Sequence, residues 1–343
     1  MRAVHAPECL AHDPPGYVVS GKLQPSPERP ERVGMLMSGL AAIGAALVEP
    51  PPVTLADCEI VHTRRYLDFL ATLPARWARV PDGGAYPTPN VHALGRANLP
   101  EPRYPASVVG QVGYHIGDGS APILAATLPA ALAAAACAIE AARFVAAGDR
   151  LAYALARPPG HHASADMAAG FCYLNNAALA AETLVRAGAR PAILDIDVHH
   201  GNGTEAIFYA RADVLTVSLH ADPARFYPFF WGHADERGTG AGDGFNLNLP
   251  LARGTGDAAY LEALATALAA IRAFGADVVV LALGLDASID DPFQGLAVST
   301  AGFAAIGARI RALGLPVVAV QEGGYPSSIL GANLAAVLGG LGA

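Results

Sequence analysis

The sequence predicts an α/β protein with a central parallel β-sheet and helices on both faces. Short apolar runs of strand length recur along the chain, and alanine-rich helical stretches lie between many of them. Hydrophobic residues make up 53% of the 343 residues and charged residues only 15%, so the chain can bury a large core. With no internal repeat and no linker, these observations favour a single domain over residues 1–343.

The predicted strands are continuous apolar runs, which is typical of strands buried on both faces. They are Leu151–Leu155, Ala192–Val198, Val214–Leu219, Val278–Leu283 and Val317–Val320. The predicted helices cover residues 130–147, 174–187, 257–274 and 300–313. The stretch from Gly119 to Ile139 is uncharged, but its prolines and many alanines indicate a loop and the start of a soluble helix rather than a membrane span.

Two regions break the alternation of strands and helices. Residues 81–121 are rich in proline and glycine and show no clear period, so we expect a functional or interface loop inserted in the domain. Residues 221–248 have a similar composition. They also hold an aromatic cluster: Phe226, Tyr227, Phe229, Phe230 and Trp231. Such a cluster indicates a pocket wall or a partner surface, with ordinary packing as the equal alternative.

Charge and cysteine content restrict the partners and the compartment. The formal net charge is −8 and the pI is about 5.7, which argues against nucleic acid and suits a small cationic substrate. None of the four cysteines falls in a CxxC pair, and residues 1–15 carry no apolar run of the signal-peptide type. We therefore expect a cytoplasmic protein with reduced thiols and no membrane association.

Polar clusters follow four of the predicted strands directly. In sequence order they are Arg157–His162, His199–Thr204, Gly284–Asp286 and Glu322–Tyr325. The carboxyl ends of parallel strands lie at one edge of a sheet, where ligands gather. The four clusters are far apart in sequence, so their convergence at that edge predicts an active site.

A metal site is predicted at the end of the second of these strands. Side chains two residues apart on a strand share a face, so Asp195, Asp197 and His199 should line up. Asp286 from a neighbouring strand would complete a set of three ligands. Three protein ligands leave a position open for water and substrate, as a catalytic metal requires.

The remaining polar residues of this edge suggest acid–base chemistry. His161 and His162 follow a stiff Pro-Pro-Gly turn and can supply a general base and an electrostatic partner. Asp195 and Asn202 are candidates to set the tautomers of the two imidazoles. Tyr325 follows two glycines, where its hydroxyl can donate to an oxyanion or can belong to an ordinary loop tyrosine.

These segments resemble the histone deacetylase superfamily, especially its bacterial class II-like members. The resemblance rests on the following stretches: Arg157–Ala163, Gly170–Asn176, Asp195–Thr204, Leu283–Asp286, Glu322–Tyr325, Pro27–Arg32 and His62–Tyr66. Residues 232–246 are further similar to acetylpolyamine amidohydrolases. The resemblance implies the arginase/deacetylase fold, with a parallel sheet of about eight strands.

The resemblance also implies roles for particular residues. It implies Asp197, His199 and Asp286 as ligands of Zn²⁺ or Fe²⁺, His162 as general base and acid with His161 beside it, and Tyr325 as the group that polarises the substrate carbonyl. One structural K⁺ would use the Asp195 carboxylate and the backbone around Asp197, His199, Ser218 and Leu219. A second K⁺ would lie near Phe208, Arg211 and Val214. Phe171 and Tyr227 would flank a narrow acyl-lysine tunnel.

The expected function is removal of acetyl groups from acetylpolyamines or related amines, and the expected assembly is a homodimer. Deacylation of protein or peptide acetyl-lysine is the alternative. The segment 85–121 holds only Glu101 and Asp118 as acidic residues, although polyamine enzymes carry acidic groups in this loop. A ureohydrolase would need a second carboxylate cluster, and an acetyl-binding module would be expected to lack one of the catalytic groups.

Overall fold

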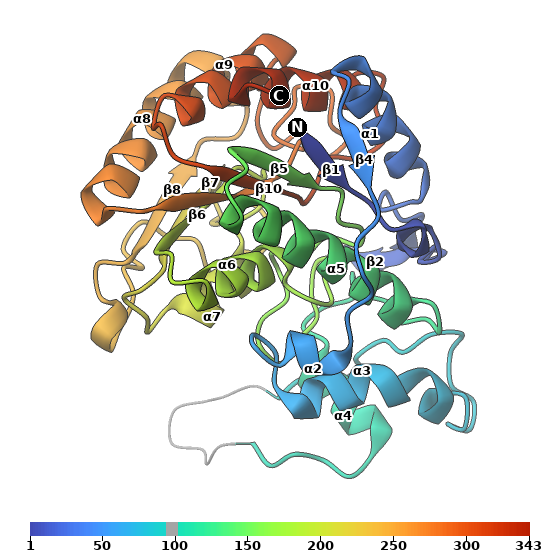
Figure 1. Cartoon of the computed structure of the whole chain (residues 1–343). Helices are drawn as coiled ribbons and strands as arrows, with labels where there is room; N and C mark the ends of the chain where they lie inside the picture. The colour runs from blue at the N-terminus through green and yellow to red at the C-terminus, as the bar shows by residue number, and fades with distance from the viewer. Residues whose placement is uncertain (94–101) are drawn as a thin grey trace.

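The computed structural model describes residues 1–93 and 102–343, and its centre is an eight-stranded parallel sheet (Figure 1). The strand order is β4-β1-β5-β10-β9-β6-β7-β8. In this order the strands are Ala46–Val48, Arg2–Val4, Leu151–Ala154, Val317–Gln321, Val278–Leu283, Pro191–Asp195, Leu215–Ala221 and Asn246–Leu251. All neighbouring pairs are parallel; Val279 of β9, for example, lies opposite Val317 of β10 and Ala192 of β6.

The described residues form ten helices (Figure 1). Most of them cover the sheet, and three lie together to one side of it. They are α1 (Glu31–Ala42), α2 (Leu55–Cys58), α3 (Arg64–Trp77), α4 (Val108–His115), α5 (Thr127–Ala146), α6 (Asn176–Arg186), α7 (Asn202–Phe208), α8 (Asp257–Phe274), α9 (Thr300–Arg311) and α10 (Leu330–Leu341). A short hairpin of β2 (Tyr17–Val19) and β3 (Lys22–Gln24) lies outside the main sheet.

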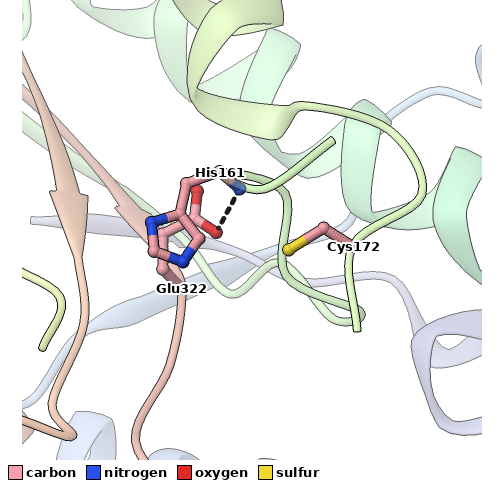
Figure 2. A group of neighbouring side chains, drawn as sticks. All are labelled: His161, Cys172 and Glu322. Carbon is pink, nitrogen blue, oxygen red and sulfur yellow. Dashed lines mark hydrogen bonds between the residues drawn. The ribbon is translucent and has the colours of Figure 1, made fainter. Parts of the chain in front are cut away.

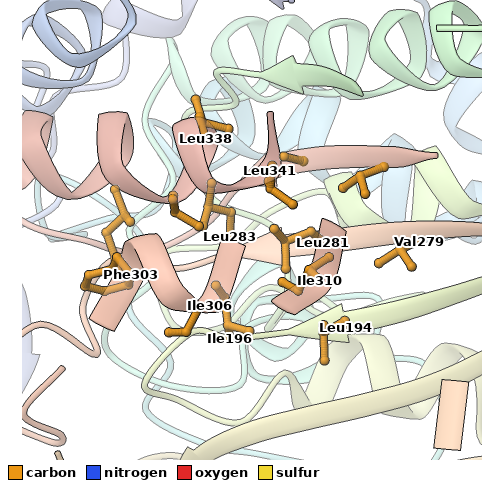
Figure 3. Close-up of a cluster of buried hydrophobic side chains, with 14 of the residues drawn as sticks. Leu194, Ile196, Val279, Leu281, Leu283, Phe303, Ile306, Ile310, Leu338 and Leu341 are labelled. Carbon is orange, nitrogen blue, oxygen red and sulfur yellow. The ribbon is translucent and has the colours of Figure 1, made fainter. Parts of the chain in front are cut away.

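Both faces of the sheet are covered because successive side chains of each buried strand point to opposite faces. In β9, Val279, Leu281 and Leu283 pack with α1, α8, α9 and α10, and Figure 3 shows this core around Phe303, Ile306, Ile310, Leu338 and Leu341. Val278, Val280 and Ala282 face the opposite core, which α5 and α6 supply largely through alanines. Small alanine side chains let these two helices lie close to the sheet.

The five predicted strands and four predicted helices are all present, with ends that differ by a few residues. Three strands of the main sheet were not predicted, the edge strands β4 and β8 and their inner neighbour on one side, β1, because they are short or only half-buried and lack an apolar run. The expectation of an irregular segment over residues 81–121 was wrong in part, since α4 lies within it. Glu101 lies outside the described residues, and the limits of the single domain stay a prediction.

One helix, α5, is long and apolar enough by composition to cross a membrane. Most of this helix is buried within the protein: 67% of the residues in its most apolar 18-residue stretch are covered. This burial is typical of a core helix, and α5 packs against β5 and α6.

The sheet order explains how distant segments of the chain meet. The four strands that run into polar clusters, β5, β10, β9 and β6, are consecutive neighbours in the sheet. Because all four are parallel, their carboxyl ends lie side by side at one edge. The clusters after these strands therefore form a single site.

Candidate active site

Asp197, His199 and Asp286 lie together at the carboxyl ends of β6 and β9. One ligand atom from each lies within 4.8 Å of the others, and all three residues are buried. Nδ1 of His199 is 3.2 Å from Oδ1 of Asp197 and 3.3 Å from Oδ2 of Asp286. Two carboxylate oxygens and one imidazole nitrogen form a donor set that zinc and ferrous iron accept in proteins.

The geometry of this group differs from the predicted extension of the strand. Strand β6 ends at Asp195, so Asp197 and His199 lie on a bend rather than on one strand face. The bend is built by side chains that bind the backbone two residues ahead: Asp195 Oδ1 accepts from the Asp197 amide at 3.0 Å, and Asp197 Oδ1 accepts from the His199 amide at 2.9 Å. Ile196 and Val198 still enter the core, as predicted.

The residues present fit a divalent cation. Among the described residues, no group makes a hydrogen bond to the buried Oδ2 of Asp286, from which Nδ1 of His199 lies 3.3 Å away, whereas Oδ1 accepts from the Val198 amide at 2.9 Å. Burial, with the nearby Asp197 carboxylate, raises the pKa of Asp286 to about 6. Burial alone would lower the pKa of His199, but the two carboxylates outweigh it and raise that pKa to about 9. Two buried carboxylates aimed at one point are stabilised by a positive charge there.

Glycine is required beside these carboxylates. A Cβ atom on Gly323 would collide with the carboxylates of Asp286 and Asp197, and one on Gly284 would collide with Asp197. The amide of Gly323 instead donates to Oδ2 of Asp197 at 2.8 Å. The strand-end glycines thus let the backbone approach the candidate ligands.

His161 and His162 lie next to this group and have the two partners expected from the sequence. Nδ1 of His161 is 2.9 Å from Asp195 Oδ2, and Nδ1 of His162 is 2.7 Å from Asn202 Oδ1. Burial lowers the pKa of His161, but the carboxylates of Asp197 and Asp195 outweigh it and raise that pKa to about 10. Burial, followed by the charge on His161, holds the pKa of His162 well below its ordinary value. One imidazole is therefore cationic and the other neutral at pH 7.

Glu322 holds the turn that carries the two histidines. Its Oε2 accepts from the amides of Gly160 at 2.6 Å and His161 at 3.0 Å, while Oε1 is buried without a partner. Figure 2 shows the Glu322 carboxylate bound to the His161 backbone amide, with Cys172 nearby. His161, Cys172 and Glu322 could by proximity also hold a metal. Their hydrogen bonds favour a structural role, because Cys172 donates to the Gly170 carbonyl at 3.4 Å and Glu322 already binds the backbone. The sequence placed Glu322 at the site without a role.

Tyr325 lies at the same edge of the sheet, four residues after the end of β10. Its side chain is only 3% exposed, and its ring packs edge-on against Phe171 and Phe293 at centroid distances of 5.9 and 5.0 Å. The Arg32 guanidinium lies 5.0 Å from the ring centroid on another side. Burial raises the pKa of Tyr325 well above its ordinary value, so its hydroxyl is a neutral donor. This environment favours the oxyanion role over that of an ordinary loop tyrosine.

Aromatic rings pack against His162 and against the candidate ligand His199. Phe171 is buried, and Tyr227 packs edge-on against His162 at 4.9 Å. Sequence reasoning missed Phe293, which lies 5.1 Å from His199, and gave no separate role to Phe226, which stacks on His199 at 5.0 Å. The one feature of the sequence that could have placed Phe293 near the site is its position seven residues after Asp286.

In the aromatic cluster of residues 226–231, two members form part of the pocket wall and three are exposed. Phe226 and Tyr227 line the site, whereas Phe229, Phe230 and Trp231 are 52, 74 and 50% exposed. The three exposed rings follow Tyr227 closely in the chain, so they lie near the site.

The residues expected to bind potassium lie in two places. Asp195 and Ser218 line a small cavity of about 10 Å³ between β6, β7 and α7, and Leu219 follows in β7. Phe208 ends α7, and Arg211 and Val214 lie in the connection to β7. The Arg211 side chain is engaged by Asp213 and Glu182. The two potassium sites stay predictions.

The arrangement of the site and the fold can be compared with known proteins. Residues 26–341 match the histone deacetylase domain. The chain belongs to the histone deacetylase family. The predicted resemblance and the arginase/deacetylase fold are thereby confirmed, and the chain is a deacetylase, an enzyme that hydrolyses an amide bond.

Within this family, several relatives match along nearly their full length. The acetylpolyamine amidohydrolase of Burkholderia pseudomallei is 44% identical over 98% of this chain and 97% of its own. The acetylpolyamine amidohydrolase of Mycoplana ramosa is 38% identical over 99% of both chains. The crystal structure of the B. pseudomallei acetylpolyamine aminohydrolase superposes with a TM-score of 0.95 over 100% of this chain and 99% of that chain.

The deacetylase fold is also shared with a more distant structure. The HD domain of HDA15 superposes with a TM-score of 0.82 at 31% identity, covering 100% of this chain and 91% of that domain.

Proposed function

We propose that this deacetylase removes acetyl groups from acetylated polyamines or closely related cationic amines, using one Zn²⁺ or Fe²⁺ ion held by Asp197, His199 and Asp286. The observation that carries the proposal is that these three buried side chains bring their ligand atoms together beside the neutral His162. The polyamine substrate is inferred from the names of the relatives that match this chain end to end.

A divalent ion at this site would polarise the substrate carbonyl and lower the pKa of a water molecule. His162 is the group that takes the proton of the attacking water, because burial keeps its imidazole neutral and Asn202 binds its Nδ1–H. That leaves the lone pair of Nε2 directed away from Asn202. The same nitrogen then delivers a proton to the leaving amine.

Two further groups respond to charge that develops on the carbonyl oxygen. The hydroxyl of Tyr325 donates to this oxygen, since its phenol stays protonated. His161, held cationic against Asp195, adds positive charge beside the base. That charge lowers the affinity of His162 for the proton it has taken from water, and so favours transfer of this proton to the leaving amine.

Phe171, Tyr227 and Phe293 would grip the methylene chain of the substrate between apolar surfaces. The distal ammonium group of a polyamine would then meet the acidic surface expected from the net charge of −8. We further propose two structural K⁺ ions at the places named above, a homodimeric assembly and a cytoplasmic location.

A second candidate is hydrolysis of acetyl-lysine in proteins or peptides. The match of residues 26–341 to the histone deacetylase domain supports it, because that family name refers to an acetylated protein. The catalytic residues would act in the same way on either substrate. Only the contacts that the substrate makes at the mouth of the site would differ.

A substrate panel separates the two candidates. Acetylputrescine, acetylcadaverine, acetylspermidine and an acetyl-lysine peptide would be assayed with metal-loaded enzyme. We expect the acetylated diamines or polyamines to give the highest kcat/KM. A clear preference for the peptide, or for an acetylated folded protein, would replace the polyamine assignment with that of a lysine deacylase.

A further inference from the structure

Asp118 joins three segments around the candidate active site. It lies between α4 and α5, and its Oδ2 accepts from the Tyr227 hydroxyl at 2.5 Å and from the Gly170 amide at 3.1 Å. Its Oδ1 accepts from the Ser120 amide at 2.7 Å, which fixes the carboxylate to its own loop. One side chain is therefore bound to segments 52 and 109 residues away in sequence.

The two groups that Asp118 binds both lie against His162. The Tyr227 ring packs on the His162 imidazole at 4.9 Å with an interplanar angle of 88°. Gly170 approaches the same ring so closely that a Cβ atom there would collide with it. The next residue, Phe171, has a φ of +68°, so its position depends on a backbone conformation that L-residues rarely adopt. A fixed carboxylate at the Gly170 amide would stabilise that backbone.

We propose that Asp118 is a positioning residue that holds the two aromatic walls of the substrate tunnel against His162, through the Tyr227 hydroxyl and the Gly170 amide. This inference rests on the proposed deacetylase site but not on the choice of polyamine over lysine. It assigns Asp118 a role in shaping the tunnel for any acylated amine.

The hydrogen bonds of Asp118 favour this role over direct binding of the substrate ammonium. Oδ2 already accepts two donors and Oδ1 accepts a third. Burial raises the pKa of Tyr227 well above its ordinary value, so the phenol remains a donor to the carboxylate. A bond between a neutral donor and a carboxylate is stronger than one between two neutral groups, which suits a contact that must resist entry of substrate.

A double-mutant cycle tests the proposal. Asp118→Ala, Tyr227→Phe and the double variant would be assayed on acetylputrescine, which is cationic, and on a neutral capped acetyl-lysine amide. We expect each single change to lower kcat/KM about tenfold on both substrates, the scale of a lost charge-assisted hydrogen bond. The double variant should lose much less than the product of the two single losses.

Asp118→Asn separates positioning from charge, because the amide keeps an acceptor oxygen and removes the negative charge. Positioning predicts that this variant loses less activity than Asp118→Ala on both substrates, because its one acceptor oxygen can still bind the Tyr227 hydroxyl and the Gly170 amide although the Ser120 contact is lost. Direct ammonium binding predicts equal losses in both variants, confined to acetylputrescine and additive with Tyr227→Phe, and that result would overturn the proposal. Asp13→Asn, the same charge change at an exposed residue, serves as the control.

A structural measurement gives a readout that does not depend on turnover. Crystal structures of the Asp118→Ala and Asp118→Asn variants should show Tyr227 and the 170–171 backbone displaced from His162 in the first and retained in the second. Unchanged positions in Asp118→Ala would overturn the proposal even if the enzyme hydrolysed none of the tested amides. Failure on acetylputrescine alone, with the cycle intact on the neutral amide, would count only against the polyamine substrate.

Discussion

Asn202 accepts a hydrogen bond from Nδ1 of His162 at 2.7 Å, and this contact decides which nitrogen of His162 serves the reaction. An amide oxygen can only accept, so Nδ1 carries the proton and Nε2 carries the lone pair. Because the partner is uncharged, it adds little stabilisation to the imidazolium form. Burial therefore dominates and keeps the imidazole neutral.

Replacement of this amide by a carboxylate should change the pH dependence of the enzyme. In Asn202→Asp a negative charge would stabilise protonated His162 and raise its pKa. Since the base must be neutral, the acidic limb of kcat/KM against pH should move to higher pH by about one unit. An acidic limb that stays in place, with metal content unchanged, would argue against His162 as the base.

The hydrogen-bonding partners of both histidines were predictable, whereas the geometry of the metal group was predicted for a partly wrong reason. Alternation along a strand would align Asp195, Asp197 and His199, but β6 ends at Asp195. The later residues are placed by side-chain-to-backbone bonds within the bend and by the Val198 amide bound to Asp286. Such local bonds compete with the strand ladder and leave no periodic signal in the sequence.

Residues that act through tertiary contacts were largely hidden from the sequence. The strand ends were visible because each polar cluster follows an apolar run. Asp118 lies in a segment without a period, and its bond to Tyr227 joins residues 109 positions apart in the sequence. Phe293 was missed for the same reason, because only the fold brings its ring against His199 and Tyr325.

The candidate ligands can be tested by removing one of them. Asp286→Ala should lose most of the bound metal and the activity with it, because two ligands hold a divalent ion poorly. Metal content per chain would be measured by elemental analysis after dialysis. Asp290→Ala removes an exposed carboxylate four residues away and should keep both metal and activity. Full occupancy and activity in Asp286→Ala would refute its assignment as a ligand.

Tyr325→Phe separates chemistry from binding, because it removes the hydroxyl and keeps the ring between Phe171 and Phe293. If the hydroxyl stabilises the oxyanion, kcat should fall by roughly 100-fold or more while metal content stays constant. The matched control is Tyr114→Phe in α4, whose ring packs against Tyr104 and His115. An unchanged kcat in Tyr325→Phe would leave the tyrosine with a packing role only.

The buried His62 should make stability depend on pH. Its side chain is 2% exposed and its Nε2 accepts from the Asn175 amide at 2.9 Å, and burial lowers its pKa from 6.5 to about 4. Between these values the unfolded chain binds a proton that the folded protein does not, so stability is lost as pH falls from about 6.5 to about 4. This one residue contributes a loss of about 1.4 kcal/mol per pH unit.

Urea unfolding of wild type and His62→Gln at several pH values isolates this contribution. The variant should be less stable at pH 7.5, and the difference between the two proteins should shrink as pH falls through the window. His92→Gln, at an exposed position, should follow the wild type at every pH. A constant difference between wild type and His62→Gln would mean that His62 titrates normally in the folded protein.

The dependence of KM on salt should distinguish a cationic substrate from a neutral one. A protein with a net charge of −8 attracts a polycation over several ångströms, and this attraction weakens as ions screen it. KM for acetylspermidine should therefore rise markedly between low salt and about 0.5 M salt, while KM for a neutral capped acetyl-lysine amide should change little. The kcat values for both should stay nearly constant, because the screened charges lie outside the buried site.

Asp118 is the one acidic residue of the 85–121 segment in the described structure, and its carboxylate already binds Tyr227 and Gly170. The attraction must then come from the wider acidic surface, so that no single exposed Asp→Asn change abolishes it. If salt raises both KM values equally, the enzyme does not recognise the distal charge, and a general lysine deacylase becomes the better assignment.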